Sequence, residues 1–96
     1  MAMNIRRLLF DVDKALSRPS LLDIAEAVSR CGGVEAFNIA VGDVDTETLD
    51  MNLTVEGDNL NYDEIVKAIE HTGAVVHGLE QIAVGDRIIE PVRRTR

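Results

Sequence analysis

The chain has 96 residues and a formal net charge of −7, with 17 acidic side chains against 10 Lys and Arg. A chain of this length forms one small domain that buries roughly 60 to 65% of the surface exposed on unfolding, and this modest burial favours a homo-oligomer. One Cys and two His leave few soft metal ligands and no internal disulfide, which favours a reducing, cytoplasmic location. The acidic charge disfavours nucleic-acid binding. No apolar run approaches the roughly 20 residues of a membrane helix.

The first predicted element is a strand, because apolar and polar residues alternate from Leu8 to Val12. Asp11 and Asp13 lie two residues apart, so their side chains point to the same face of this strand. Two carboxylates side by side repel each other unless something neutralises them. A bound cation, solvent, or a salt bridge to Arg7 or Lys14 are the alternatives.

A helix follows, with apolar residues spaced i, i+3, i+4 and i+7 between Leu21 and Val28. Pro19 and Ser20 mark its beginning and Gly32 marks its end. The segment 34–57 then contains two alternating apolar runs around a polar turn near residues 45–48. This pattern predicts a β-hairpin.

The second helix begins after Asn61, where Glu64 completes a predicted capping box, and it ends at Gly73. The last strand runs from Val75 to about Val84. Its apolar parity changes near Gly78, which indicates a β-bulge.

The two halves of the chain repeat one pattern. Sliding the sequence so that Leu8 meets Leu49 also aligns Ile24 with Ile65, and Gly32 with Gly73. The chain therefore reads as a doubled β-α-β unit. The order β-α-β-β-α-β predicts an α+β, ferredoxin-like fold, with a four-stranded antiparallel sheet and both helices on one face. We expect a single domain over residues 1–90 and a short basic C-terminal tail, PVRRTR, over residues 91–96.

Strand order decides where the acidic residues meet. In the usual 4-1-3-2 order of this fold the first and third strands are neighbours, and we expect them to run parallel. Their carboxyl ends, close to His77 on the last strand, would then carry four acidic residues, Asp11, Asp13, Glu56 and Asp58. The acidic residues of the hairpin, within 43–47, would lie at the opposite edge. The sheet face without helices is predicted to show Arg7, Leu9 and Asp11 beside Asn52, Thr54 and Glu56.

Asp11, Asp13 and His77 are the candidate metal ligands. Ca²⁺ and Mg²⁺ prefer carboxylate oxygens, and an acidic field concentrates such cations. Two carboxylates cannot fill a calcium shell of roughly 6 to 8 oxygens, so neighbours, water or another subunit must supply the rest. The alternatives are a solvated or ion-paired strand end for the two Asp, and a packed or hydrogen-bonded residue for His77.

The hairpin sequence GDVDTETLD superficially suggests a calcium loop. An EF-hand requires Gly at position 6 and Glu at position 12. Counting from Asp43, these positions hold Thr48 and Thr54. The segment is therefore interpreted as a polar hairpin tip.

Three motifs cover most of the chain: IRRLLFDVDK, GGVEAFNIAVGDVDTET and VEGDNLNYDEIVKAIEHTGAVVHGLEQIAVG. They resemble a mostly archaeal family catalogued as domain of unknown function 211. The resemblance implies a ferredoxin-like fold and a ring-like or otherwise multimeric assembly, and it brings no activity. A looser similarity to heavy-metal-associated domains lacks their Cys-x-x-Cys pair, because the loop here is DKALSRPS and Cys31 lies at the far end of the first helix.

These patterns favour a non-enzymatic protein that self-assembles and binds a divalent cation or a small-molecule ligand at acidic subunit junctions. A ligand-free structural or regulatory interaction module is the alternative, followed by a small-molecule enzyme or a metal carrier. The loop after the first strand has no Gly-rich phosphate cradle of the acylphosphatase type. The basic tail is a candidate to reach the acidic hairpin of a neighbouring copy.

Overall fold

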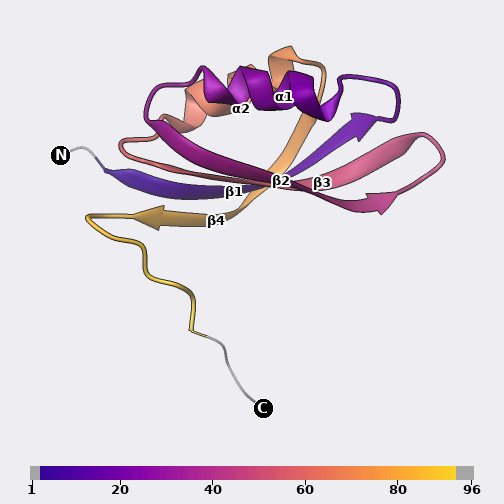
Figure 1. Cartoon of the computed structure of the whole chain (residues 1–96). Helices are drawn as coiled ribbons and strands as arrows, with labels where there is room; N and C mark the ends of the chain where they lie inside the picture. The colour runs from indigo at the N-terminus through magenta and orange to yellow at the C-terminus, as the bar shows by residue number, and fades with distance from the viewer. Residues whose placement is uncertain (1–2, 93–96) are drawn as a thin grey trace.

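The computed structural model describes residues 3–92. The elements are β1 (Ile5–Ala15), α1 (Leu21–Ser29), β2 (Val34–Val44), β3 (Thr48–Gly57), α2 (Tyr62–His71) and β4 (Val75–Val84). Both helices form one layer over one face of a four-stranded sheet (Figure 1). The ferredoxin-like α+β fold predicted from the sequence is thus confirmed. Among the described residues, neither helix has the length and apolar character needed to cross a membrane.

The sheet has the order β2-β3-β1-β4, and β1 pairs antiparallel with both of its neighbours. The predicted order is confirmed, but the expectation that the first and third strands run parallel is wrong. The crossover through α1 makes β2 parallel to β1, and the hairpin then reverses the chain. Strand β3 must therefore run opposite to β1, which moves its carboxyl end to the other end of the sheet.

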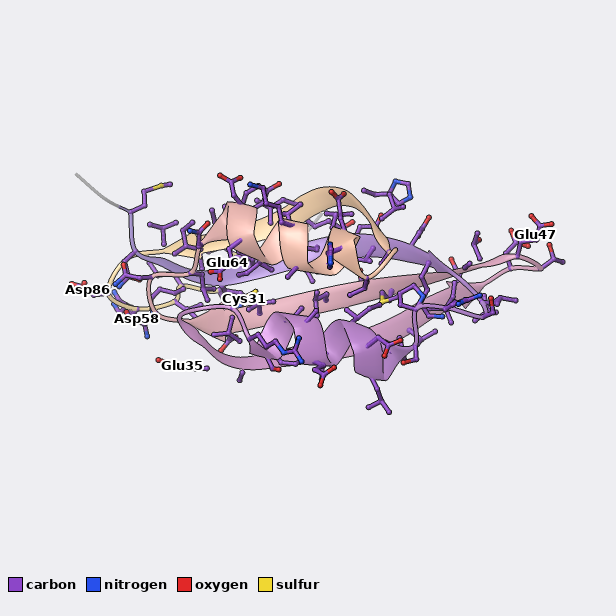
Figure 2. The ribbon with its side chains drawn as sticks, turned by 90° about the horizontal axis from the view of Figure 1, so that it is seen from above. Cys31, Glu35, Glu47, Asp58, Glu64 and Asp86 are labelled. Carbon is purple, nitrogen blue, oxygen red and sulfur yellow. The ribbon has the colours of Figure 1, made fainter. Side chains whose placement is uncertain are left out.

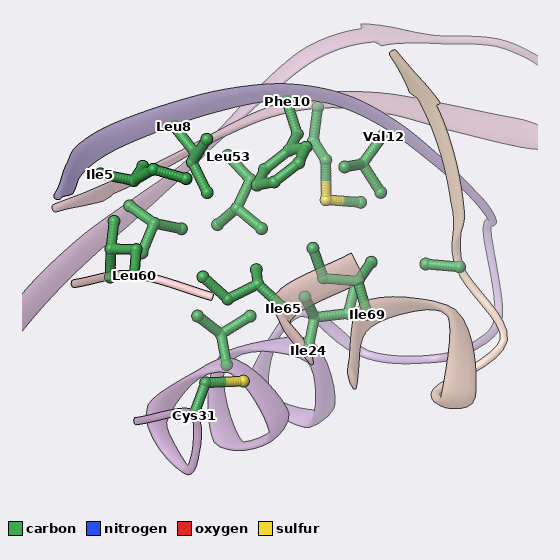
Figure 3. Close-up of a cluster of buried hydrophobic side chains, with 14 residues drawn as sticks. Ile5, Leu8, Phe10, Val12, Ile24, Cys31, Leu53, Leu60, Ile65 and Ile69 are labelled. Atoms are coloured by element: carbon green, nitrogen blue, oxygen red, sulfur yellow. The ribbon is translucent and has the colours of Figure 1, made fainter. Parts of the chain in front are cut away.

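The core lies between the sheet and the two helices. Leu8, Phe10 and Val12 point from β1 toward the helical layer and are completely buried (Figure 3). Ile24 of α1 and Ile65 of α2 pack against them from the helical layer. The alternation seen in the sequence thus separates a buried face of β1 from an open face that carries Asp11 and Asp13.

Local sequence signals fix the beginning of each helix. The Ser20 hydroxyl accepts a hydrogen bond from the backbone N–H of Asp23, whose carboxylate accepts from the N–H of Ser20, so α1 has a full capping box. The Asn61 side chain accepts from the backbone N–H of Glu64 at the start of α2. The Glu64 carboxylate instead accepts from the N–H of Gly32, and it thereby links α2 to the turn that follows α1. The capping box predicted for the second helix is therefore only half formed.

The open face has the composition predicted from alternation. Across β1 and β3, Arg7 lies opposite Glu56, and Asp11 lies opposite Asn52. On the other side of β1, the pairing with β4 shifts register between Asp11–Gly78 and Val12–Val76. This irregularity is the bulge predicted near Gly78.

Candidate metal centre

The antiparallel register brings a third carboxylate to the two on β1. Asp13 lies directly opposite Asp50 of β3. One ligand oxygen from each of Asp11, Asp13 and Asp50 can be chosen so that all three lie within 4.8 Å of one another. All three residues are partly exposed on the open face of the sheet. The sequence interpretation found two members of this group and missed Asp50, because it placed β3 in the wrong direction.

The β2–β3 hairpin contributes further side chains next to these three carboxylates. An open hollow of about 410 Å³ is lined by Asp11, Asp13 and Asp50 together with Asp43, Asp45, Thr48 and His77. The backbone N–H of Asp45 donates to the carbonyl of Thr48 at 2.8 Å and closes the turn predicted at residues 45–48. The prediction that Asp43 and Asp45 lie at the opposite edge from Asp11 and Asp13 is therefore wrong.

The other predicted members of the acidic edge lie far from this hollow. Figure 2 shows Asp58 at one end of the molecule and Glu47, at the hairpin tip, at the other. The Asp58 carboxylate accepts from Arg6, and the Glu56 carboxylate accepts from Arg7. These two acidic residues are therefore neutralised locally and do not belong to the hollow, which follows from the direction of β3.

His77 reaches the group through Asp13. Its Nε2 lies 2.6 Å from Oδ2 of Asp13, so the two side chains share a hydrogen bond across the β1–β4 pair. The sequence placed His77 near Asp11 as a ligand, whereas in the structure its nearest carboxylate partner is Asp13. His77 lies next to Gly78, where the pairing of β4 with β1 shifts register. It is not one of the three residues whose ligand atoms converge.

The salt bridges considered for Asp11 and Asp13 are not formed within residues 3–92. Arg7 instead contacts the carboxylates of Glu56 and Glu90. Lys14 is buried, and its Nζ donates to the backbone carbonyls of Ala15 and Leu16. In the described part of the chain, the basic side chain within salt-bridge distance of this group is therefore the imidazole of His77.

Crowding of the carboxylates perturbs the titration of Asp11. A hydrogen bond shared with Asp50 raises the pKa of the Asp11 carboxyl, and desolvation and the negative charges of Asp50, Glu80 and Asp13 raise it further. The raised pKa means that ionisation of Asp11 is less favourable in the folded protein than in the unfolded chain. A cation at this position would remove part of that repulsion.

The single thiol takes no part in this group. Cys31 is 7% exposed and packs in the core. Burial and the negative charge of Glu64 raise the pKa of its thiol, which disfavours the reactive thiolate.

These features define a class, namely ferredoxin-like domains with an open sheet face and a carboxylate cluster at one end. Residues 6–96 of the chain match the model of one protein family, DUF211, which is described as uncharacterised ArCR. The chain therefore belongs to this family, DUF211. It is also 36% identical over 89 residues to the uncharacterised protein MJ0319 of Methanocaldococcus jannaschii, which corresponds to 93% of this chain and 91% of that protein.

Proposed function

We propose that this protein is a non-enzymatic, self-assembling module that binds a hard divalent cation, Ca²⁺ or Mg²⁺, at Asp11, Asp13 and Asp50. The convergence of these three carboxylates within 4.8 Å carries the proposal. Oxygen ligands are the ones that Ca²⁺ and Mg²⁺ prefer, and a chain with a net charge of −7 attracts cations to its surface.

Neighbouring residues and water can supply the other oxygen ligands of the cation. Asp43, Asp45 and Thr48 line the same hollow and carry further oxygen atoms. Water completes the shell of an exposed site of this kind. Imidazole is a poor ligand for hard cations. We therefore assign His77 the role of holding Asp13 through its 2.6 Å hydrogen bond rather than that of a ligand.

The two edges of the sheet support self-assembly. Strands β2 and β4 form these edges and run in opposite directions, so β2 of one copy can pair antiparallel with β4 of the next. Exposed apolar side chains lie on both edges: Val41 and Val44 on β2, and Leu79, Ile82 and Val84 on β4. An interface between β2 of one copy and β4 of the next is heterologous, because it joins two different surfaces. Such an interface generates a ring if the rotation between successive copies returns to the first copy.

The non-enzymatic part of the proposal rests on the side chains near the hollow. Carboxylates, one imidazole and the hydroxyl of Thr48 line it, and the thiol of Cys31 is buried in the core. The hollow is open to solvent rather than a closed pocket that excludes water around a substrate. These features suit ion binding better than covalent catalysis.

Native mass spectrometry before and after chelation tests the cation and the assembly together. We expect an oligomer that retains divalent ions and loses their mass on chelation, and we expect calorimetry to show heat with Ca²⁺ or Mg²⁺. The variant Asp11→Asn/Asp50→Asn should lose this binding. The control Asp63→Asn/Glu70→Gln removes two exposed acidic groups from α2 and should retain it.

A second pair of variants tests the edges. Ile82→Lys places a charge on the edge strand β4 and should lower the assembled mass, whereas Leu22→Lys on the exposed face of α1 should not. An ion-free oligomer without heat of binding would support the ligand-free interaction module instead. A monomer at all concentrations would remove the assembly from the proposal.

A further inference from the structure

The segment that follows β4, residues 85–92, forms an arm that leaves the domain on the open side of the sheet, away from the helices (Figure 1). The backbone N–H of Gly85 donates to the carbonyl of Asn4, and the Glu90 carboxylate accepts from Nη1 of Arg7 at 2.9 Å. These two contacts hold the arm at the end of the sheet where β1 begins. Residues 93–96, with the three Arg of the basic tail, lie outside the described residues.

The arm presents apolar side chains to solvent. Ile89 is 69% exposed and Val92 is 90% exposed, and they lie on either side of the anchored Glu90. Removing such side chains from water is favourable. The arm therefore offers apolar surface that its own copy leaves uncovered.

A second, smaller hollow lies on the open face where β2 begins, and we call it the β2 hollow. Its volume is about 160 Å³, and its lining comes from β2 and β3: Ala36, Phe37, Asn38, Thr54 and Glu56. A cavity of about 150 Å³ holds a molecule as large as benzene. The β2 hollow thus has room for one branched aliphatic side chain. The high exposure of Val92 shows that this side chain does not fill the β2 hollow of its own copy.

The edge pairing proposed above would bring the arm to the β2 hollow of another copy, and the inference rests on that pairing. Strands β1 and β2 are both antiparallel to β3, so β2 begins at the end of the sheet where β4 ends and the arm starts. With β4 of one copy beside β2 of the next, that β2 lies two strand spacings, about 10 Å, from β1 and its Arg7. From Glu90 to Val92 an extended chain spans about 7 Å, and the two side chains cover the remainder.

We propose that the arm docks on the open sheet face of the next copy in the assembly, with the side chain of Val92 in the β2 hollow. The contact between Arg7 and Glu90 stays within the first copy and directs the arm toward its neighbour. Each copy gives one arm and receives one, so the contact is heterologous, like the edge pairing.

A disulfide cross-link tests this placement directly. The variant Val92→Cys/Asn38→Cys, in a Cys31→Ser background, places one thiol on the arm and one in the lining of the β2 hollow. After oxidation we expect a ladder of multimers on a denaturing gel, which reductant collapses to a monomer. Val92→Cys/Leu22→Cys is the control, because Leu22 is exposed on α1, on the other side of the sheet, and it should give no ladder. A disulfide within one chain, or equal ladders in both variants, would overturn the proposal.

Native mass spectrometry over a dilution series separates the arm from the edge pairing. Val92→Asp, or Ala36→Trp, which fills the β2 hollow, should raise the concentration at which the assembly dissociates about 10-fold or more. Ala40→Trp, on the same strand and face but outside the β2 hollow, should not. A monomeric parent would refute the self-assembly and the arm together. An oligomeric parent with no effect of Val92→Asp or Ala36→Trp would refute the arm alone.

Discussion

Asp13 of β1 lies directly opposite Asp50 of β3, so two acidic residues occupy one cross-strand pair of an antiparallel sheet. Like charges in such a pair are destabilising. Asp11 lies next to them on the same face and completes the cluster of three carboxylates. Among residues 3–92, no Lys or Arg forms a salt bridge with this cluster. The strand pairing thus maintains a repulsive group at the surface, and a positively charged partner would stabilise the fold.

The first prediction concerns cation affinity. Asp50→Asn removes one charged ligand and should weaken Ca²⁺ or Mg²⁺ binding about 10-fold or more, as measured by calorimetry. The same variant should raise the thermal unfolding midpoint in chelator, because the cross-strand repulsion with Asp13 is lost. Asp63→Asn on α2 is the matched control. Unchanged affinity in Asp50→Asn would exclude this residue from the site.

The second prediction concerns pH. The pKa of Asp11 is raised in the folded protein, chiefly by the hydrogen bond with Asp50, so between the unfolded value of about 3.9 and the raised value the native state binds more protons than the unfolded state. Through this group, stability therefore decreases as the pH rises across that window. Asp11→Asn should remove this decrease and raise stability at neutral pH. Denaturant unfolding in chelator at a series of pH values measures it, and Glu35→Gln, at an exposed position of β2, is the control.

The third prediction concerns two glycines with contrasting surroundings. Gly33 has φ of +82°, and a Cβ there would collide with the backbone carbonyl oxygen of Asp58. Gly33→Ala should therefore destabilise the fold by more than about 1 kcal/mol. A Cβ on Gly78 would meet nothing within 4 Å, so Gly78→Ala should change stability by less than about 0.5 kcal/mol. Chemical denaturation of both variants distinguishes them, and a larger loss in Gly78→Ala would contradict this ranking.

The fourth prediction concerns the start of α1. The Ser20 side chain accepts from the N–H of Asp23 at 3.0 Å, and Ser20→Ala removes this cap. The expected loss is about 0.5–2 kcal/mol in the free energy of unfolding. Ser17→Ala, at an exposed position in the preceding loop, should have a negligible effect. If the two variants were equally stable, the capping box would contribute nothing measurable.

The sequence alone determined the order of the elements, because each one depends on local chemistry. Apolar alternation marks β1 from Leu8 to Val12, and Ser20 and Asn61 mark where the helices begin. The parity change near Gly78 likewise predicted the irregular pairing of β4. The family resemblance, carried by motifs along most of the chain, agrees with the family match over residues 6–96.

Only the tertiary structure decided which acidic residues meet. Asp50 lies in a hairpin strand, and its sequence neighbours give no sign that it pairs with Asp13; that pairing depends on the direction and register of β3 against β1. The same register separates Glu56 and Asp58 from the cluster and joins them to Arg7 and Arg6. Local patterns fix the face of the strand on which a side chain lies. Hydrogen bonding between strands that are distant in the sequence fixes which side chains lie beside it. Because a binding site requires several side chains close together, its composition depends on this pairing.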